Sequence, residues 1–260
     1  MKKCPRSPRQ FLVLGGANFT NCSLFFRLFA STEIVSSPHE VLNQRDRHSV
    51  KKGIAEALGT GLISLAVIGS GIMATVLTND AGIQLVINCI ATVATLFLVI
   101  TVFQQISGSH FNPMVSIFLL SKKNLGQLTL YIFAQLVGAL LGAVTANLMF
   151  ERQALELSLT LREGNHLLFA EFIAAAGLVF IVFLKAKSVK KMRPALISLW
   201  ILGAYFFTSS TSFANPAITF GRMFSDSFTG IAPSSAAMFI AIQVIGSTAG
   251  YGLAQFFRKK

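Results

Sequence analysis

Residues 107–114 read SGSHFNPM and residues 211–217 read TSFANPA, so a small polar run ends in Asn-Pro at two places in the chain. Asn is a strong N-cap residue, and proline suits the first helical turn, where a backbone N–H has no intrahelical partner. The residue before a proline is held out of the helical region, so an extended loop enters each helix. Each stretch therefore predicts a loop that runs into a short helix.

The rest of the chain is apolar enough to lie in a lipid bilayer. It is 53% hydrophobic and 12% charged, about half the charged fraction of a soluble domain. A bilayer core about 30 Å thick needs roughly 20 apolar helical residues to cross it. Six stretches have this character: 53–77, 83–105, 125–149, 166–186, 194–211 and 232–257. The two stretches that contain Asn-Pro, 107–120 and 209–224, are too short to cross and are expected to be re-entrant.

The spans form an internal repeat. Ala55-Glu56 lies in the first span and Ala170-Glu171 in the fourth, and an Asn-Pro stretch follows each. Because each half has three spans, the halves enter the membrane from opposite sides, and such inverted repeats place their site near the midplane. The sequence predicts an all-α membrane protein with six transmembrane helices and two re-entrant half-helices in two inverted repeats. The repeats cover 53–149 and 166–257 within a channel domain of residues 51–260.

The charges indicate how the chain is oriented. With both termini in the cytoplasm, the inner connections hold Lys51, Lys52, Lys122, Lys123, Lys185, Lys187, Lys190, Lys191, Arg193, Arg258, Lys259 and Lys260. The outer connections hold only Arg152, Arg162 and Arg222, beside several acidic residues. This asymmetry follows the positive-inside rule for membrane proteins. It accounts for the net charge of +12 without a nucleic-acid partner.

Residues 1–50 carry basic residues around an interrupted apolar stretch. We interpret them as a disordered or surface-lying cytoplasmic tail, with a cleavable signal peptide as the alternative. Cys4, Cys22 and Cys89 form no spaced pair or Cys/His cluster, so neither a disulfide framework nor a metal site is expected. No nucleophile–base pair or phosphate-binding glycine loop occurs either, so neither an enzyme nor a cofactor is expected.

Glutamates and Asn-Pro boxes have distinct expected roles. Two half-helices that begin near the midplane direct the positive ends of their dipoles at one place, which opposes the passage of cations and protons. Glu56 and Glu171 lie in apolar spans, where a charge costs several kcal/mol unless it has partners. Each is expected to accept hydrogen bonds from the loop before its half-helix. The alternative is a proton-coupled transporter that uses one of them as proton carrier.

The two boxes, the Ala-Glu pairs and Gln135 in the third span resemble the aquaporin/aquaglyceroporin (major intrinsic protein) family over about residues 53–257. The resemblance implies a homotetramer with one pore per protomer, no cofactor, and a constriction formed by Asn112, Pro113, Met114, Asn215, Pro216 and Ala217. Met114 stands where the family usually has Ala. Ile218 stands where most members have the arginine of an outer selectivity filter.

Counting without gaps from the two Asn residues places this inferred filter at Thr92, Gly203, Ser212 and Ile218. Without a bulky aromatic, histidine or cation, it is expected to be wide and mildly polar. Arg222, one turn beyond Ile218, would share its helical face and restore positive potential there, or would pair with Asp226 instead. His110 is expected to line the cytoplasmic half of the pore.

Residues 210–233 resemble a bacterial subgroup whose members often accompany arsenic-resistance genes. The resemblance implies a passive channel in the plasma membrane, which for a bacterium is the inner membrane, for small uncharged solutes: glycerol-like molecules, metalloid hydroxides such as arsenite, and water. The alternatives are a water-selective channel, the proton-coupled transporter and a structural membrane protein with a closed pore.

Overall fold

A computed structural model describes residues 38–121, 124–185 and 187–257 of the chain. The chain divides into two units, residues 1–44 and 45–260. Only the beginning of the first helix lies in the described part of the first unit. The second unit contains the membrane spans.

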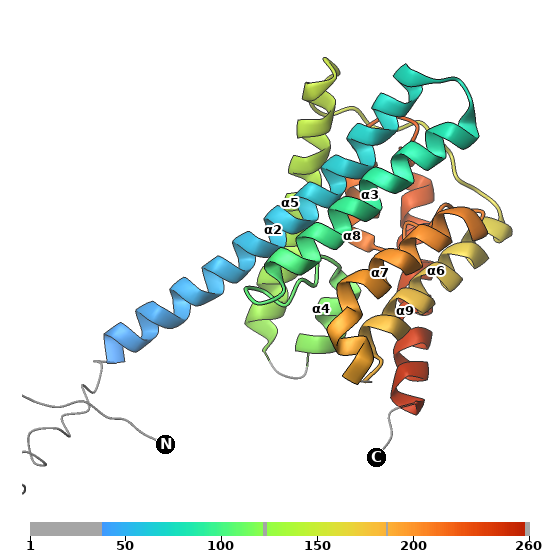
Figure 1. The fold of residues 1–260 in the computed structure, drawn as a ribbon. Coiled ribbons are helices and arrows are strands. Elements are labelled where there is room, and N and C mark those ends of the chain that lie inside the picture. Colours follow the sequence, from blue (N-terminus) through green and yellow to red (C-terminus); the bar gives the residue numbers. More distant parts are fainter. Residues whose placement is uncertain (1–37, 122–123, 186, 258–260) are drawn as a thin grey trace, which may run out of the picture. The chain divides into compact units, whose positions relative to one another are not determined.

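Eight helices occur in the described residues (Figure 1): α2 (Pro38–Leu77), α3 (Ala81–Phe103), α4 (Pro113–Leu120), α5 (Leu125–Met149), α6 (Asn165–Phe183), α7 (Lys187–Phe207), α8 (Pro216–Arg222) and α9 (Pro233–Phe256). Five of them, α2 from Arg47 onward, α3, α5, α6 and α9, are long and apolar enough to cross a membrane. The sixth long helix, α7, begins with a basic run, and its apolar part starts at Pro194. The predicted all-helical fold is confirmed.

The first helix begins earlier than expected. Residues 38–50, which were expected to belong to a disordered or surface-lying tail, are helical and continue into the first span. The reason is local, because Pro38 occupies the favoured first position of a helix and no further proline or glycine follows before Gly53. The rest of the predicted tail, residues 1–37, lies outside the described residues.

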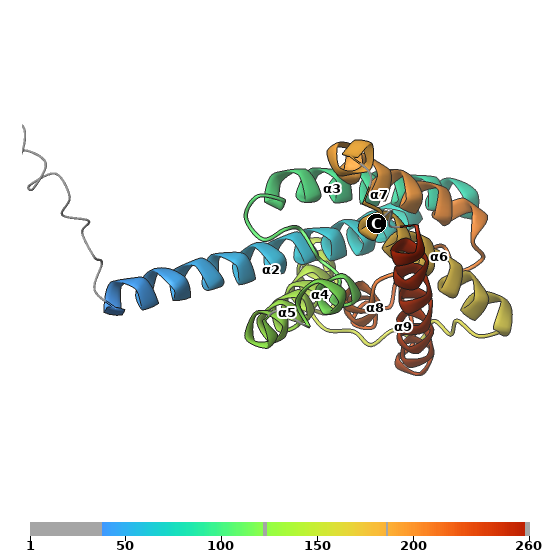
Figure 2. The ribbon, with the colours of Figure 1, turned by 90° about the horizontal axis from the view of Figure 1, so that it is seen from below.

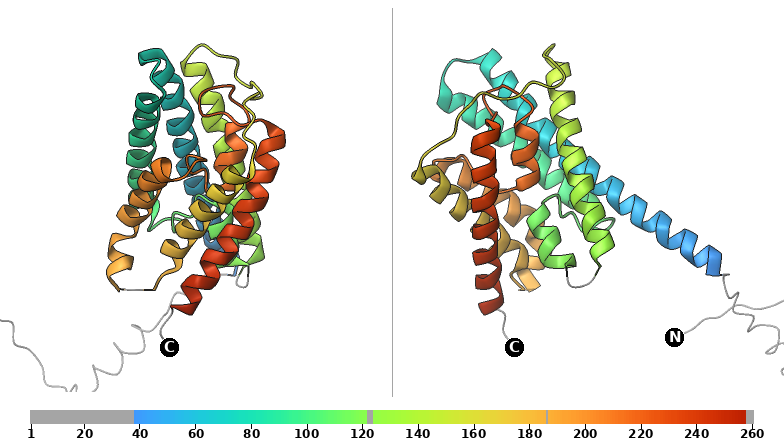
Figure 3. Two further views of the ribbon diagram at one scale, coloured as in Figure 1. Left: turned by 90° about the vertical axis from the view of Figure 1, so that its right-hand side faces the viewer. Right: turned by 180° about the vertical axis from the view of Figure 1, so that it is seen from behind.

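The two half-helices lie between the long helices. In the right panel of Figure 3, α8 lies in the upper half and α4 in the lower half of the space between α5 and α9. Figure 2 shows α3 and α7 side by side on the opposite side of the unit. The order long, long, short, long therefore occurs twice, which is the repeat that the sequence predicts.

Glycines bring the outer helices of each repeat into backbone contact. A Cβ atom on Gly138 of α5 would overlap the carbonyl of Ala57 on α2, and one on Gly250 of α9 would overlap the carbonyl of Ala176 on α6. Small residues at such crossings are how membrane helices approach closely without a hydrophobic driving force. The same device in both repeats holds α2 against α5 and α6 against α9.

Candidate functional site: a cavity at the meeting point of the two half-helices

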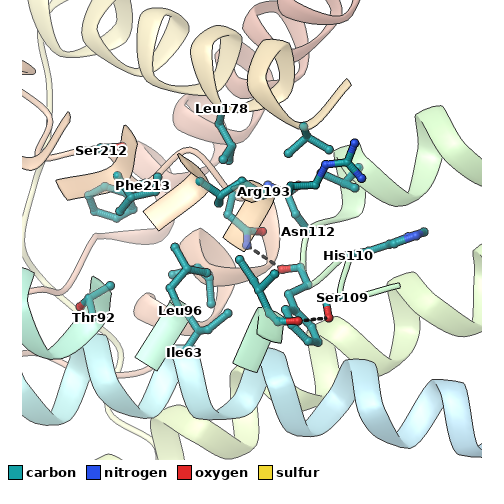
Figure 4. Close-up of a pocket in the computed structure, with 18 of the residues that line it drawn as sticks. Ile63, Thr92, Leu96, Ser109, His110, Asn112, Leu178, Arg193, Ser212 and Phe213 are labelled. Atoms are coloured by element: carbon teal, nitrogen blue, oxygen red, sulfur yellow. Dashed lines mark hydrogen bonds between the residues drawn. The ribbon is translucent and has the colours of Figure 1, made fainter. Parts of the chain in front are cut away.

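A cavity of about 300 Å³ runs past the two Asn-Pro boxes. Its walls come from α2, α3, α6 and α7 and from the two loops with their half-helices. In Figure 4, Thr92, Ser212 and Phe213 lie at one end, and His110 and Arg193 lie at the other. Between them the wall is largely aliphatic, with Ile63, Leu96 and Leu178 beside Asn112.

The two asparagines tie the half-helices together. Asn112 Oδ1 accepts from the N–H of Met114 (2.9 Å), and Asn215 Oδ1 accepts from the N–H of Ala217 (3.0 Å), so each caps its own helix. Asn112 Nδ2 donates to the carbonyl of Ala214 (3.1 Å), and Asn215 Nδ2 donates to the carbonyl of Phe111 (2.7 Å). Each asparagine thus binds the loop of the other repeat, and the positive ends of α4 and α8 meet at one place on the cavity wall.

The loops before the half-helices have an unusual backbone. Ser109 and Phe111 in the first loop have φ values of 52° and 48°, and Ser212 and Ala214 in the second have 54° and 49°. Non-glycine residues in this left-handed region cost of order 1–3 kcal/mol each and persist only where the surroundings hold them. In both loops the left-handed residues lie one and three positions before the Asn, so the strained conformation is a feature that the two repeats share.

Two glutamates hold the loops in this conformation. Glu56 accepts from Ser107 Oγ (2.6 Å), the N–H of His110 (3.0 Å) and the N–H of Phe111 (2.7 Å). Glu171 accepts from the N–H groups of Phe213 (2.8 Å) and Ala214 (2.9 Å).

Both carboxylates are fully buried, and neither is on the cavity wall. The geometry is that of a structural acceptor rather than a carrier open to the pore.

A glutamine completes each cluster. Gln135 Nε2 donates to Glu56 (2.8 Å) and to Ser116 of α4 (2.9 Å). Gln243 Nε2 donates to Glu171 (2.8 Å) and to Thr219 of α8 (2.9 Å). Sequence reasoning singled out Gln135 but missed Gln243. The internal repeat could have predicted Gln243, because both glutamines lie in the third span of their half.

The end of the cavity near Thr92 and Ser212 differs from the expected filter. Thr92, Ser212 and Ile218 line it, but Gly203 does not. From α7, the cavity instead meets Ile197, Ile201 and Tyr205, and the Tyr205 hydroxyl donates to Thr92 Oγ1 (3.2 Å).

An aromatic ring thus lines the cavity where the expected filter had Gly203. Counting without gaps from Asn215 missed the lumen-facing position by two residues, and two residues turn a helical side chain by about 200°.

Arg222 lies on the cavity wall. Its side chain is 4% exposed, and its guanidinium lies 3.3 Å from the centre of the Phe213 ring. The expected alternative, a pair between Arg222 and Asp226, is not formed. The Asp226 carboxylate accepts instead from the N–H of Leu159 (3.0 Å) and the hydroxyl of Ser158 (3.4 Å) in the α5–α6 loop.

His110 lies at the other end of the cavity, as Figure 4 shows. Its Nδ1 lies 3.1 Å from Ser116 Oγ, and its ring packs edge-on against Tyr131 with centroids 5.0 Å apart. Over the part of the chain that the structure describes, no three His, Cys, Asp or Glu side chains gather as a metal site would require.

Comparisons with known proteins give one consistent answer. A family model described as "Major intrinsic protein" matches residues 43–212. Aquaglyceroporin AqpS of Rhizobium meliloti (strain 1021) is 42% identical over 209 residues, which cover 78% of this chain and 88% of that protein. A probable aquaporin TIP-type of Medicago truncatula is 31% identical over 204 residues, covering 72% and 79%.

The fold also occurs in a solved structure. The X-ray structure of the aquaglyceroporin from Plasmodium falciparum matches with a TM-score of 0.60 at 22% identity, over 81% of this chain and 96% of that one.

Proposed function

Because this chain belongs to the major intrinsic protein family, it is a membrane channel for small uncharged solutes, and we propose that glycerol-like polyols and metalloid hydroxides such as arsenite pass through it together with water. The relative from Rhizobium meliloti is named an aquaglyceroporin, which supports a solute larger than water.

The observation that carries the proposal is the pair of asparagines joined across the two repeats at the cavity wall. Two helix N-termini and two amide groups there present positive potential and hydrogen-bond donors to whatever passes. A neutral hydroxyl can accept these hydrogen bonds, whereas a cation is repelled. Aliphatic side chains such as Ile63 and Leu96 line the wall near them, and they suit the carbon backbone of a polyol.

At the outer end we propose a filter formed by Thr92, Tyr205, Ser212 and Ile218. Thr92 and Ser212 contribute hydroxyls, and Ile218 is apolar. Tyr205 makes this end narrower than the sequence suggested, but its hydroxyl is turned to Thr92, so the ring adds a flat apolar wall rather than a charge. An opening with one apolar side and several hydroxyls suits a small molecule that carries hydroxyl groups.

The setting of the channel is also part of the proposal. The basic inner connections favour a chain with both termini in the cytoplasm, and the bacterial relative favours the inner membrane. The family resemblance favours a homotetramer in which every protomer carries its own pore. Nucleic acid has no role in this function.

Flux measurements in proteoliposomes test the proposed solute class. Stopped-flow light scattering compares water, urea, glycerol and arsenite in vesicles with wild-type protein and in empty vesicles. We expect glycerol and arsenite fluxes well above the empty-vesicle level. High water flux with every other flux at that level would mean a water-selective channel instead. In the variant Ile218→Arg, the larger side chain should lower glycerol flux more than water flux.

A further inference from the structure

Arg222 is a cation in an unexpected place. It ends the outer half-helix, it is 4% exposed, and it lines the cavity. A charge at membrane depth costs several kcal/mol unless it has a partner or faces water, so such residues mark sites of function. No carboxylate within the described ranges lies close enough to form an ion pair with it, since the ion pair found there joins Arg152 to Glu156. The guanidinium is therefore stabilised by neutral groups and by the cavity that it lines.

The side chain is held on two sides. Nε donates to the carbonyl of Thr229, and the face of the Phe213 ring lies 3.3 Å from the guanidinium carbon. A guanidinium stacked on an aromatic face gains cation–π attraction and loses freedom to swing away. Arg222 is thus fixed in position rather than free to fold out of the cavity.

A second arginine supports the same ring. Arg162 of the α5–α6 loop lies 5.1 Å from the Phe213 centroid, and it donates to the carbonyls of Gly230 (2.9 Å) and Phe228 (3.2 Å). These contacts join the outer loop to the segment that follows α8. Phe213 therefore carries two cations at the outer end of the cavity, of which only Arg222 is on the cavity wall.

The remaining donors of Arg222 point to its role. Within the described residues, the guanidinium makes a hydrogen bond through Nε, to the carbonyl of Thr229. The side chain lines the cavity, so its two Nη groups are placed to donate to what the cavity holds. A guanidinium carries five N–H donors and no acceptor, and it keeps its proton in proteins. It can donate to oxygen atoms of a passing solute, but it cannot relay a proton.

We infer that Arg222 is the specificity-determining cation of the outer filter, supplied from one turn beyond Ile218. Its Nη groups donate hydrogen bonds to the hydroxyl oxygens of neutral solutes, and its charge turns back cations. This inference rests on the proposed channel function and adds a residue to it. Because the cation sits one helical turn beyond Ile218, charge exclusion and steric selection occupy successive levels of the pore.

The test measures cation leak and solute flux on the same vesicles. Proteoliposomes carry a trapped pH dye, a potassium gradient and valinomycin, so that proton entry is followed under a set potential, and light scattering follows glycerol. The variants are Arg222→Leu and Arg222→Lys. Arg152→Leu is the matched control, because it removes the same charge from the outer side at a part-buried residue away from the cavity.

We expect proton leak through Arg222→Leu to rise about tenfold or more over wild type, since lowering an electrostatic barrier acts exponentially on rate. Arg222→Lys keeps the charge, so its proton leak should stay near that of wild type. Lysine lacks the planar set of N–H donors of the guanidinium, so the ratio of glycerol flux to urea flux should change. Arg152→Leu should match wild type in both measurements. If Arg222→Leu fails to assemble, the neutral Arg222→Gln replaces it, because an amide can still donate to the Thr229 carbonyl.

A neutral variant with the leak and the flux ratio of wild type overturns the inference. Failure of the proposed function is distinct from that result, because the wild-type protein itself would then pass no neutral solute.

Discussion

At the scale of single residues, the clearest feature is that the two buried glutamates serve as acceptors for strained loops. Glu56 accepts four hydrogen bonds and Glu171 three, from backbone N–H groups, from a glutamine of the same repeat and, for Glu56, from the Ser107 hydroxyl. Neither carboxylate lies on the cavity wall, so both bind the loops rather than a passing solute. The loops need these acceptors because, in their left-handed conformation, the backbone N–H groups have no helical carbonyl to which they can donate.

Substitution of Glu56 separates the structural role from proton transport. Glu56→Leu leaves the N–H groups of His110 and Phe111 unpaired inside the membrane, at about 1–3 kcal/mol each, so we expect little folded protein. Glu56→Gln keeps one acceptor oxygen and should give a less stable channel that still passes glycerol. Size-exclusion profiles, melting curves and light scattering measure these outcomes, with exposed Glu151→Gln as control. A stable Glu56→Gln protein that has lost transport would favour the proton carrier.

The sequence predicted the places of the two asparagines but not that of Tyr205. Asn112 and Asn215 lie where the Asn-Pro pattern placed them, because capping and the proline effect are local and act within a few residues. Tyr205 was missed because its place on the wall depends on the length of the loop between α7 and Asn215. A change of two residues in that loop alters no local preference, but it rotates the face of α7 that meets the cavity.

At the scale of elements, the glycines of α5 and α9 decide how closely the helices of a repeat approach. At each crossing the backbone of a glycine lies directly against the backbone of the partner helix, so an added methyl group has no space to enter. The sequence shows these glycines, but a glycine in an apolar span has several explanations. Only the partner helix, far away in the chain, tells which glycines are required.

Gly250 and Gly252 of α9 form a matched pair for this idea. Gly250→Ala would drive a Cβ into the Ala176 carbonyl, whereas a Cβ on Gly252 would meet no atom within 4 Å. Overpacking costs roughly 1–3 kcal/mol. Gly250→Ala should therefore lower the melting temperature by several degrees, about 2–4 °C per kcal/mol for a chain of this size. Gly252→Ala should be neutral or slightly stabilising, because alanine favours a helix. Equal melting temperatures for the two variants would contradict the packing argument.

At the scale of the whole molecule, the inverted repeat follows from pattern alone, while the lumen does not. Span lengths, the repeated glutamate and the Asn-Pro pairs are properties of short segments, and they are sufficient to predict six long helices and two half-helices. Which side chains face one another across the cavity depends on the relative rotation of helices from both halves. Arg222 illustrates this, since sequence allowed either a lumen position or a pair with Asp226, and only the assembled fold distinguishes them.

Orientation is the remaining property of the whole molecule that a direct measurement can decide. With the termini inside, the α5–α6 loop lies outside, where Leu159 is 79% exposed. The test uses a background with Cys4→Ser and Cys22→Ser, in which the remaining native cysteine, Cys89, is buried. A membrane-impermeant maleimide added to intact spheroplasts should therefore label Leu159→Cys and leave the background protein unlabelled. After permeabilisation, a cysteine at Lys185, beside the inner end of the cavity, should react as well. Labelling of Lys185→Cys in intact spheroplasts, with Leu159→Cys protected, would reverse the topology, because the basic connections would then face outward against the charge asymmetry.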